Sequence, residues 1–232
     1  LVPAVASAMV LKDYRTAKDK ISLSIKLTML IGLPSSVGIA LLADPILKLI
    51  FPNASEGGLL LEISAYSIIL IALTQTLAGI LQGLGRVIVP AVALFIGALV
   101  KLAINFTIVS IPSVNIYGAA IGSIACYFIA TVISYTALMR SFKIDFEVKD
   151  FIIKPVFATA TMGIAVYYSY HWMRFDASLS NAISTLAAVT LGAAVFGVIL
   201  LLIGGITSKD LKVVPYGEKL SRVLIRYKLL RG

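Results

Sequence analysis

The sequence carries little charge and almost none of the residue types that build catalytic or metal centres. Charged residues make up 13% of the 232-residue chain, about half of the roughly 25% usual in soluble domains. The one cysteine, Cys126, excludes an intrachain disulfide and a multi-cysteine metal site, and the one histidine, His171, excludes a histidine-based metal centre. No phosphate-binding loop, HExxH motif or paired nucleophile and base is present. We therefore expect no enzymatic activity, no cofactor and no bound metal.

Hydrophobic residues, at 59%, instead predict an integral membrane protein. A bilayer core about 30 Å thick needs roughly 20 apolar residues per helix. The runs without Asp, Glu, Lys or Arg are 27–43, 63–85, 102–139, 155–173 and 177–208, and the segment SIPSVN at 110–115 divides the longest. These runs are apolar on every face, which favours helices over an alternating barrel strand. The predicted fold is all-α, with six transmembrane helices at 22–43, 60–82, 87–110, 116–139, 152–172 and 182–205.

The basic residues predict the orientation of these helices. The net charge is +9, and most Lys and Arg lie before the first predicted helix, in every second loop and after the last. The opposite loops contain only Lys48 and Arg174. Because basic loops stay on the cytoplasmic side, both chain ends are predicted to be cytoplasmic, and the charge indicates membrane orientation and no nucleic-acid partner. The cluster Tyr167, Tyr168, Tyr170, His171 and Trp172 then falls at the outer interface, so His171 is interpreted as an interfacial ring and not as a proton-coupling group.

The chain divides into four predicted regions. Residues 1–21 precede the first predicted transmembrane helix and include a cytoplasmic amphipathic elbow, and residues 22–142 form four transmembrane helices. Residues 143–205 add two further helices, and residues 206–232 form a basic cytoplasmic tail with an amphipathic helix. Because the chain starts at Leu1 and not at Met, we expect a fragment of a longer protein.

Polar residues within the predicted spans are the candidates for function. Lys101 lies too far from either end of the helix at 87–110 to reach an interface easily, and Asn105 shares its face one turn later. Lys101 either lines a cavity and meets an anion, or contacts a carbonyl or carboxylate of a neighbouring helix. Gln75 and Gln82 lie on one face of the second span and hydrogen-bond either a polar ligand or another helix.

Two charged residues and three pairs of small residues have simpler interpretations. Lys26 and Glu62 lie near helix ends and can extend to the headgroups. The small-residue pairs Gly79 with Gly83, Gly118 with Gly122, and Ala188 with Gly192 allow helices to approach closely. These features indicate helix packing and topology and do not discriminate between functions.

Several stretches taken in order resemble a known family. They are LVPAVASA, IGLPSSVGIALLADPILKLIF, GILQGLGR, LVKLAINFTIV and IYGAAIGS. Together they are similar to the C-terminal half of the polysaccharide-exporter branch of the multidrug/oligosaccharidyl-lipid/polysaccharide (MOP) flippase superfamily. The nearest pattern is that of the stage V sporulation protein B-like and MurJ-like lipid II flippases. The resemblance covers about residues 1–142.

The resemblance implies a fourteen-helix, MATE-like transporter with two six-helix lobes around a cavity and two additional C-terminal helices. Under it this chain is a C-terminal fragment that supplies the last six helices, and LVPAVASA is the end of the helix before them. It implies a bacterial cell-membrane flippase for an undecaprenyl-diphosphate-linked saccharide, with membrane lipids and the missing N-terminal lobe as partners. Lys101 matches a recurrent basic position of this branch, and the substrate-binding hypothesis is Lys101, Asn105, Gln75 and Gln82. One alternative is a cation-coupled multidrug antiporter, which would prefer buried carboxylates, whereas Glu62 is the only acid within a predicted span of this chain. The other alternative is a non-transporting membrane scaffold.

Overall fold

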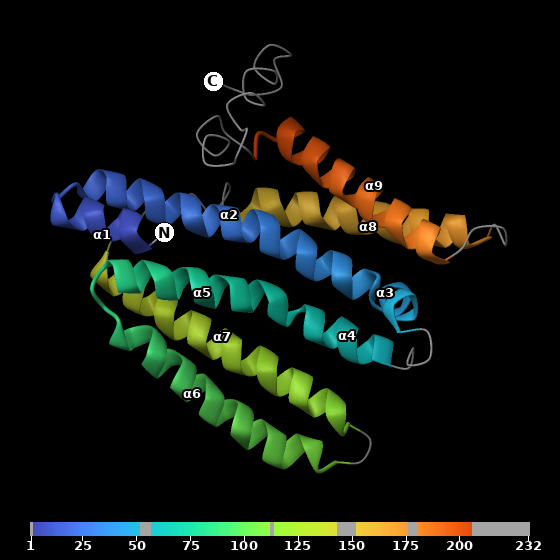
Figure 1. The fold of residues 1–232 in the computed structure, drawn as a ribbon, viewed down its shortest axis with the longest axis horizontal. Coiled ribbons are helices and arrows are strands. Elements are labelled where there is room, and N and C mark those ends of the chain that lie inside the picture. The colour runs from blue at the N-terminus through green and yellow to red at the C-terminus, as the bar shows by residue number, and fades with distance from the viewer. Residues whose placement is uncertain (1, 52–56, 112–113, 143–151, 176–180, 206–232) are drawn as a thin grey trace. The chain divides into compact units, whose positions relative to one another are not determined.

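The computed structural model describes residues 2–51, 57–111, 114–142, 152–175 and 181–205. Within these ranges every regular element is helical (Figure 1), which confirms the all-α membrane expectation. The chain forms two compact units, residues 1–146 and 147–232, which are described separately. The predicted amphipathic helix of the tail and the basic loop at 143–149 lie outside the described residues.

The first unit contains seven described α-helices and one π-helical segment. In chain order they are α1 (Val2–Val10), α2 (Tyr14–Leu41), α3 (Ala43–Ile50), α4 (Gly58–Ala65), α5 (Ser67–Gly83), α6 (Ile88–Ile104), the π-helical η2 (Asn105–Val109) and α7 (Ile116–Ser141). The second unit contains α8 (Lys154–Phe175) and α9 (Asn181–Leu202).

Five segments of the described chain are long and apolar enough to cross a membrane. They are Tyr14–Leu41, Gly58–Gly83, Ile88–Val109, Ile116–Ser141 and Asn181–Leu202. The predicted span at 152–172 also folds as a helix, α8, with 22 residues. It is not among the five, because Tyr167, Tyr168, Tyr170, His171 and Trp172 make its C-terminal part less apolar. That α8 crosses the membrane therefore stays a prediction.

The first span begins earlier than the sequence pattern indicates. The turn before it contains only Leu11, Lys12 and Asp13, so Arg15, Lys18 and Lys20 belong to the first turns of α2. Asp13 explains the early start, because its carboxylate accepts a hydrogen bond of 3.0 Å from the backbone N–H of Thr16 and so caps the helix. Hydrogen bonds from Thr16 also hold the pKa of Asp13 below its usual value.

Three further features differ from the predicted helices. The second span is a pair, α4 and α5, that meets at Tyr66, and a separate short helix, α3, follows the first span. The third span changes from α- to π-helical geometry at Asn105. None of these three differences has a signal in apolar periodicity, because each alters the helix locally without changing the composition of the apolar run.

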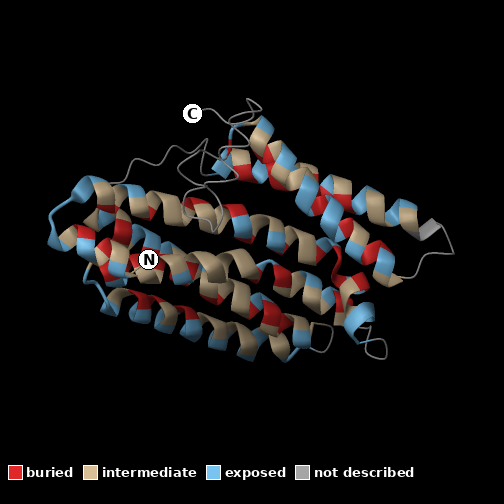
Figure 2. Ribbon diagram, turned by 45° about the horizontal axis from the view of Figure 1, so that its top comes forward, coloured by how far each residue is buried: buried red, intermediate tan, exposed pale blue. Residues whose placement is uncertain are grey.

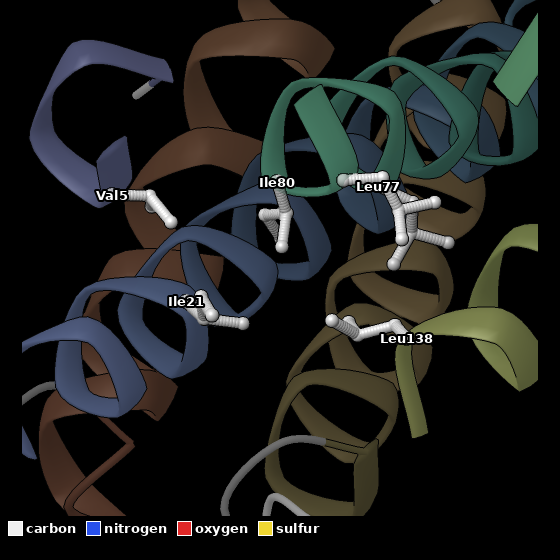
Figure 3. Close-up of a cluster of buried hydrophobic side chains, with 6 residues drawn as sticks. Val5, Ile21, Leu77, Ile80 and Leu138 are labelled. Atoms are coloured by element: carbon white, nitrogen blue, oxygen red, sulfur yellow. The ribbon is translucent and has the colours of Figure 1, made fainter. Parts of the chain in front are cut away.

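Helix α5 lies at the centre of the first unit, between α2 and α7, and α6 packs on the other side of α7 (Figure 1). A fully apolar cluster joins α1, α2, α5 and α7 through Val5, Ile21, Leu77, Ile80, Leu81 and Leu138 (Figure 3). Hydroxyls add specific links: Thr28 and Thr76 share a hydrogen bond of 2.7 Å between α2 and α5, and Thr74 and Thr131 share one of 2.9 Å between α5 and α7. These bonds place polar groups of a span against partners inside the unit.

The second unit is an antiparallel helix pair. The Lys154 ammonium donates to the Gly204 carbonyl at 3.0 Å near one end, and the Tyr170 hydroxyl donates to Oδ1 of Asn181 at 3.0 Å near the other. Between them Gly192 allows close approach, since a Cβ there would lie 2.6 Å from Val166. In both units buried residues form narrow stripes along the helices (Figure 2), and the exposed remainder includes many large apolar side chains, as expected for helices in lipid.

Candidate functional site

Helices α6 and α7 pack closely along a line of small residues, which we call the α6–α7 seam. A Cβ added at Gly97 would lie 2.5 Å from the carbonyl oxygen of Cys126, and one at Gly118 would lie 3.0 Å from Ile108. Between these points, a Cβ at Gly122 would lie 2.8 Å from Oδ1 of Asn105 and 3.3 Å from Cγ of Lys101. Lys101 and Asn105 therefore both lie against Gly122 of α7.

Lys101 is a half-buried cation within a span, eight residues before the span ends at Val109. Eight residues correspond to about 12 Å of helix. Among the described residues Lys101 makes no hydrogen bond or ion pair, and the described carboxylates, Asp13, Asp19, Asp44 and Glu62, are all exposed. The part of the chain that the structure describes therefore contains no buried acid that could pair with Lys101.

Asn105 begins the π-helical segment, and its side-chain oxygen is buried and has no hydrogen-bond partner among the described residues. A π-helical turn is rare and occurs frequently at functional sites. A buried acceptor without a donor is also uncommon, because it loses its bond to water and gains none in return. The turn from Lys101 to Asn105 thus combines three unusual features: an unpaired cation, an unpaired acceptor and a change of helix type.

Gln75 and Gln82 share an exposed face of α5. The core face of the same helix carries Leu77, Ile80 and Leu81, so the two glutamines point away from the apolar cluster. The structure thus brings Lys101 together with Asn105, while the two glutamines lie on another helix and outside the seam. The four candidate residues form two pairs and not one constellation.

Two residues differ in importance from what the sequence indicated. Lys26 is 6% exposed and contacts other residues, whereas its position near a helix end had predicted extension to the headgroups. The expectation failed because α2 begins at Tyr14, which places Lys26 well inside the helix and not near its end. Gly122 was interpreted only as a packing residue, and its contact with Lys101 and Asn105 has no signal in a single sequence.

Among the residues that the structure describes, no three His, Cys, Asp or Glu side chains lie close enough to hold a metal ion. Cys126 is a buried free thiol in the α6–α7 seam. The chemistry that the described residues offer is therefore a positive charge and amide groups inside a bilayer-length helix bundle.

Comparison with known proteins gives one family and three curated relatives. The family model for the lipid II flippase MurJ matches residues 1–187. The chain is 31% identical over 231 residues to the uncharacterized membrane protein YabM of Bacillus subtilis. It is 23% identical over 227 residues to stage V sporulation protein B, and 26% identical over 208 residues to the lipid II flippase MurJ of the same organism.

The matches cover most of this chain but less than half of each relative. They include 97% of the chain for YabM and stage V sporulation protein B and 84% for MurJ, against 42%, 42% and 38% of the relatives' own lengths. The chain thus spans about two fifths of the curated relatives that it matches. No solved structure matches the chain significantly.

Proposed function

The chain belongs to the lipid II flippase MurJ family, and on this premise we propose that the protein translocates a lipid-linked saccharide across the cytoplasmic membrane. The proposed substrate is an undecaprenyl-diphosphate-linked cell-wall precursor, moved from the cytoplasmic to the outer leaflet by alternating access. Since the matched relatives extend well beyond the matched region, the proposal concerns the full-length protein.

Such a substrate needs a charged and hydrated path through a layer that excludes both charge and water. Its diphosphate and sugar lose hydration in the bilayer, whereas its apolar polyprenyl tail is soluble in the hydrocarbon core. A basic group at membrane depth compensates the diphosphate, and amide groups compensate the sugar hydroxyls. The observation that supports the proposal most directly is that Lys101 lies inside a span and has no counter-charge among the described residues.

We assign the candidate residues as follows. Lys101 supplies positive charge to the diphosphate, and Asn105 belongs to the same site because it lies one turn away against the same glycine. Gln75 and Gln82 offer exposed amides to sugar hydroxyls. No nucleotide site is visible in the sequence, so an ion gradient or the membrane potential drives transport in this proposal.

A cation-coupled antiporter is less well supported. It would bind its cation with buried carboxylates, and the four carboxylates in the described part of the chain are all exposed. No observation on the described residues favours a non-transporting scaffold, since a scaffold does not need an unpaired cation in a span.

The test of the proposal replaces Lys101 in the full-length protein. We expect Lys101→Ala to reduce translocation of the lipid-linked precursor about tenfold or more, because a charge-assisted hydrogen bond contributes about 1.5–3 kcal/mol. Lys101→Arg should retain part of the activity, and Lys101→Glu should have the least. The measurement is exposure of the precursor on the outer leaflet, at membrane abundance matched by immunoblot.

Lys48→Ala is the matched control, since Lys48 is an exposed lysine in α3 outside the site. It should translocate precursor as the wild type does. Full activity of Lys101→Ala at normal abundance would contradict the proposed role of Lys101 and remove the observation that carries this function.

A further inference from the structure

We propose that Asn105 and Gly122 are positioning residues for the Lys101 ammonium, which rests on Oδ1 of Asn105 when no diphosphate is bound. The inference depends on the proposed function for the identity of the ligand. It adds a resting contact for the cation and gives Asn105 a specific role in the site.

The distances permit this contact. The Cβ position at Gly122 is 2.8 Å from Oδ1 of Asn105 and 3.3 Å from Cγ of Lys101, so these two atoms are at most 6.1 Å apart, the sum of the two distances. The ammonium lies three bonds beyond Cγ and reaches about 3.8 Å from it. These lengths allow Nζ to reach hydrogen-bonding distance of Oδ1 when the Lys101 side chain extends toward it.

Both groups need this contact. Oδ1 of Asn105 is buried and has no donor, and Lys101 has neither an acceptor nor a counter-charge among the described residues. Lys101 lies four residues before Asn105, on the same face of the helix. An amide oxygen is a suitable resting partner because it is neutral: it accepts from the ammonium but competes weakly with a diphosphate, which a carboxylate would not.

Gly122 makes room for the pair. An alanine Cβ at this position would press on Oδ1 of Asn105 and on the stem of Lys101, and so displace both. Gly118, one turn away on α7, is also crowded: its Cβ would lie 3.0 Å from the side chain of Ile108, 3.1 Å from that of Val109 and 3.2 Å from the Val109 backbone nitrogen, all in η2. The two glycines are thus similarly crowded, and the nearest neighbours of Gly118 are apolar side chains and backbone.

The first experiment compares Gly122→Ala with Gly118→Ala in the full-length protein. We expect both variants to lose similar thermal stability, and only Gly122→Ala to lose translocation, by about tenfold at matched abundance, with a raised apparent KM for the precursor. Asn105→Ser in the Gly122→Ala background should restore part of the transport, since the shorter side chain relieves the crowding and keeps an oxygen acceptor. Equal losses of transport in the two glycine variants would refute the positioning role.

The second experiment tests the contact without relying on transport. Asn105→Asp should keep normal abundance, because the carboxylate pairs with the Lys101 ammonium, yet it should transport poorly because it retains that ammonium. Adding Lys101→Ala to Asn105→Asp should lower the abundance several-fold, since the new carboxylate is then buried without a partner. An abundance of Asn105→Asp that does not depend on Lys101 would show that the two side chains do not meet.

The two proposals fail in different ways. If Lys101→Ala is fully active, the proposed function loses its support. If Lys101→Ala is inactive while Gly122→Ala behaves as Gly118→Ala does, the function stands and only the positioning role of Gly122 and Asn105 is wrong.

Discussion

At the scale of single residues, a carboxylate from another helix lies against the start of α4. Gly57 caps α4 without a side-chain hydrogen bond, and the space that a Cβ of Gly58 would fill is occupied by the carboxylate of Asp44 from α3. A helix N-terminus carries partial positive charge, so an anion there is stabilising. Asp44 therefore links α3 to the beginning of the second span.

This arrangement predicts that Gly58→Ala destabilises the protein by about 1–2 kcal/mol, because the new methyl group displaces the Asp44 carboxylate. Gly57→Ala is the control, since its Cβ would meet only the flexible end of Leu47, at 3.2 Å. Thermal unfolding in detergent measures both. The double variant Gly58→Ala with Asp44→Ala should lose less stability than the two single losses added; strict additivity would refute the contact.

At the scale of elements, the third span, formed by α6 and η2, has two different faces. Its exposed face carries Val92, Phe95, Leu99, Leu102 and Phe106, which suit contact with lipid tails. Its opposite face carries the residues of the α6–α7 seam, including Lys101 and Asn105. A cation on the lipid face would cost at least about 2.5 kcal/mol, so the helix keeps its one charge on the face that packs against protein.

The end of α5 supplies a second prediction at this scale. Gly85 has a φ of +77°, its N–H donates to Gln82, and the next N–H, of Arg86, donates to Leu81 at 2.8 Å. This left-handed closure favours glycine. We expect Gly85→Ala to lower stability by about 1 kcal/mol through backbone strain alone, because a Cβ there meets nothing within 4 Å.

Gly197→Ala on α9 is the control for this prediction. Its Cβ also meets nothing within 4 Å, but its backbone is helical. Thermal unfolding should show no loss for Gly197→Ala. An equal loss in both variants would mean that backbone conformation at Gly85 is not the cause.

At the scale of the whole molecule, the topology predicted from basic residues is still to be tested. In a Cys126→Ala background, single cysteines near Asn53 and Ser113 should react with an impermeant thiol reagent added outside sealed cells, and cysteines near Lys143 and Lys219 should not. The physical reason is that loops rich in Lys and Arg remain cytoplasmic. Labelling at Lys143 from outside would reverse the orientation.

The sequence by itself determined the class of the protein and most of its helices. Charge-free runs of membrane length require backbone hydrogen bonds within the chain segment, so five of the six predicted spans are helices long and apolar enough to cross a bilayer. The shared face of Lys101 and Asn105 also follows from the sequence, because helical geometry brings residues four apart to the same side. The predicted start of the first span was less accurate, because Asp13, which caps α2, lies outside the apolar run.

Only the tertiary structure decided what that face meets. Lys101 and Gly122 are 21 residues apart, and their contact depends on the register of two antiparallel helices, which no local pattern encodes. The same register buries Oδ1 of Asn105, whereas the packing of α5 between α2 and α7 leaves Gln75 and Gln82 exposed. Periodicity identifies the polar residues of a span; the neighbouring helix determines which of them are enclosed, because burial is a property of two surfaces in contact.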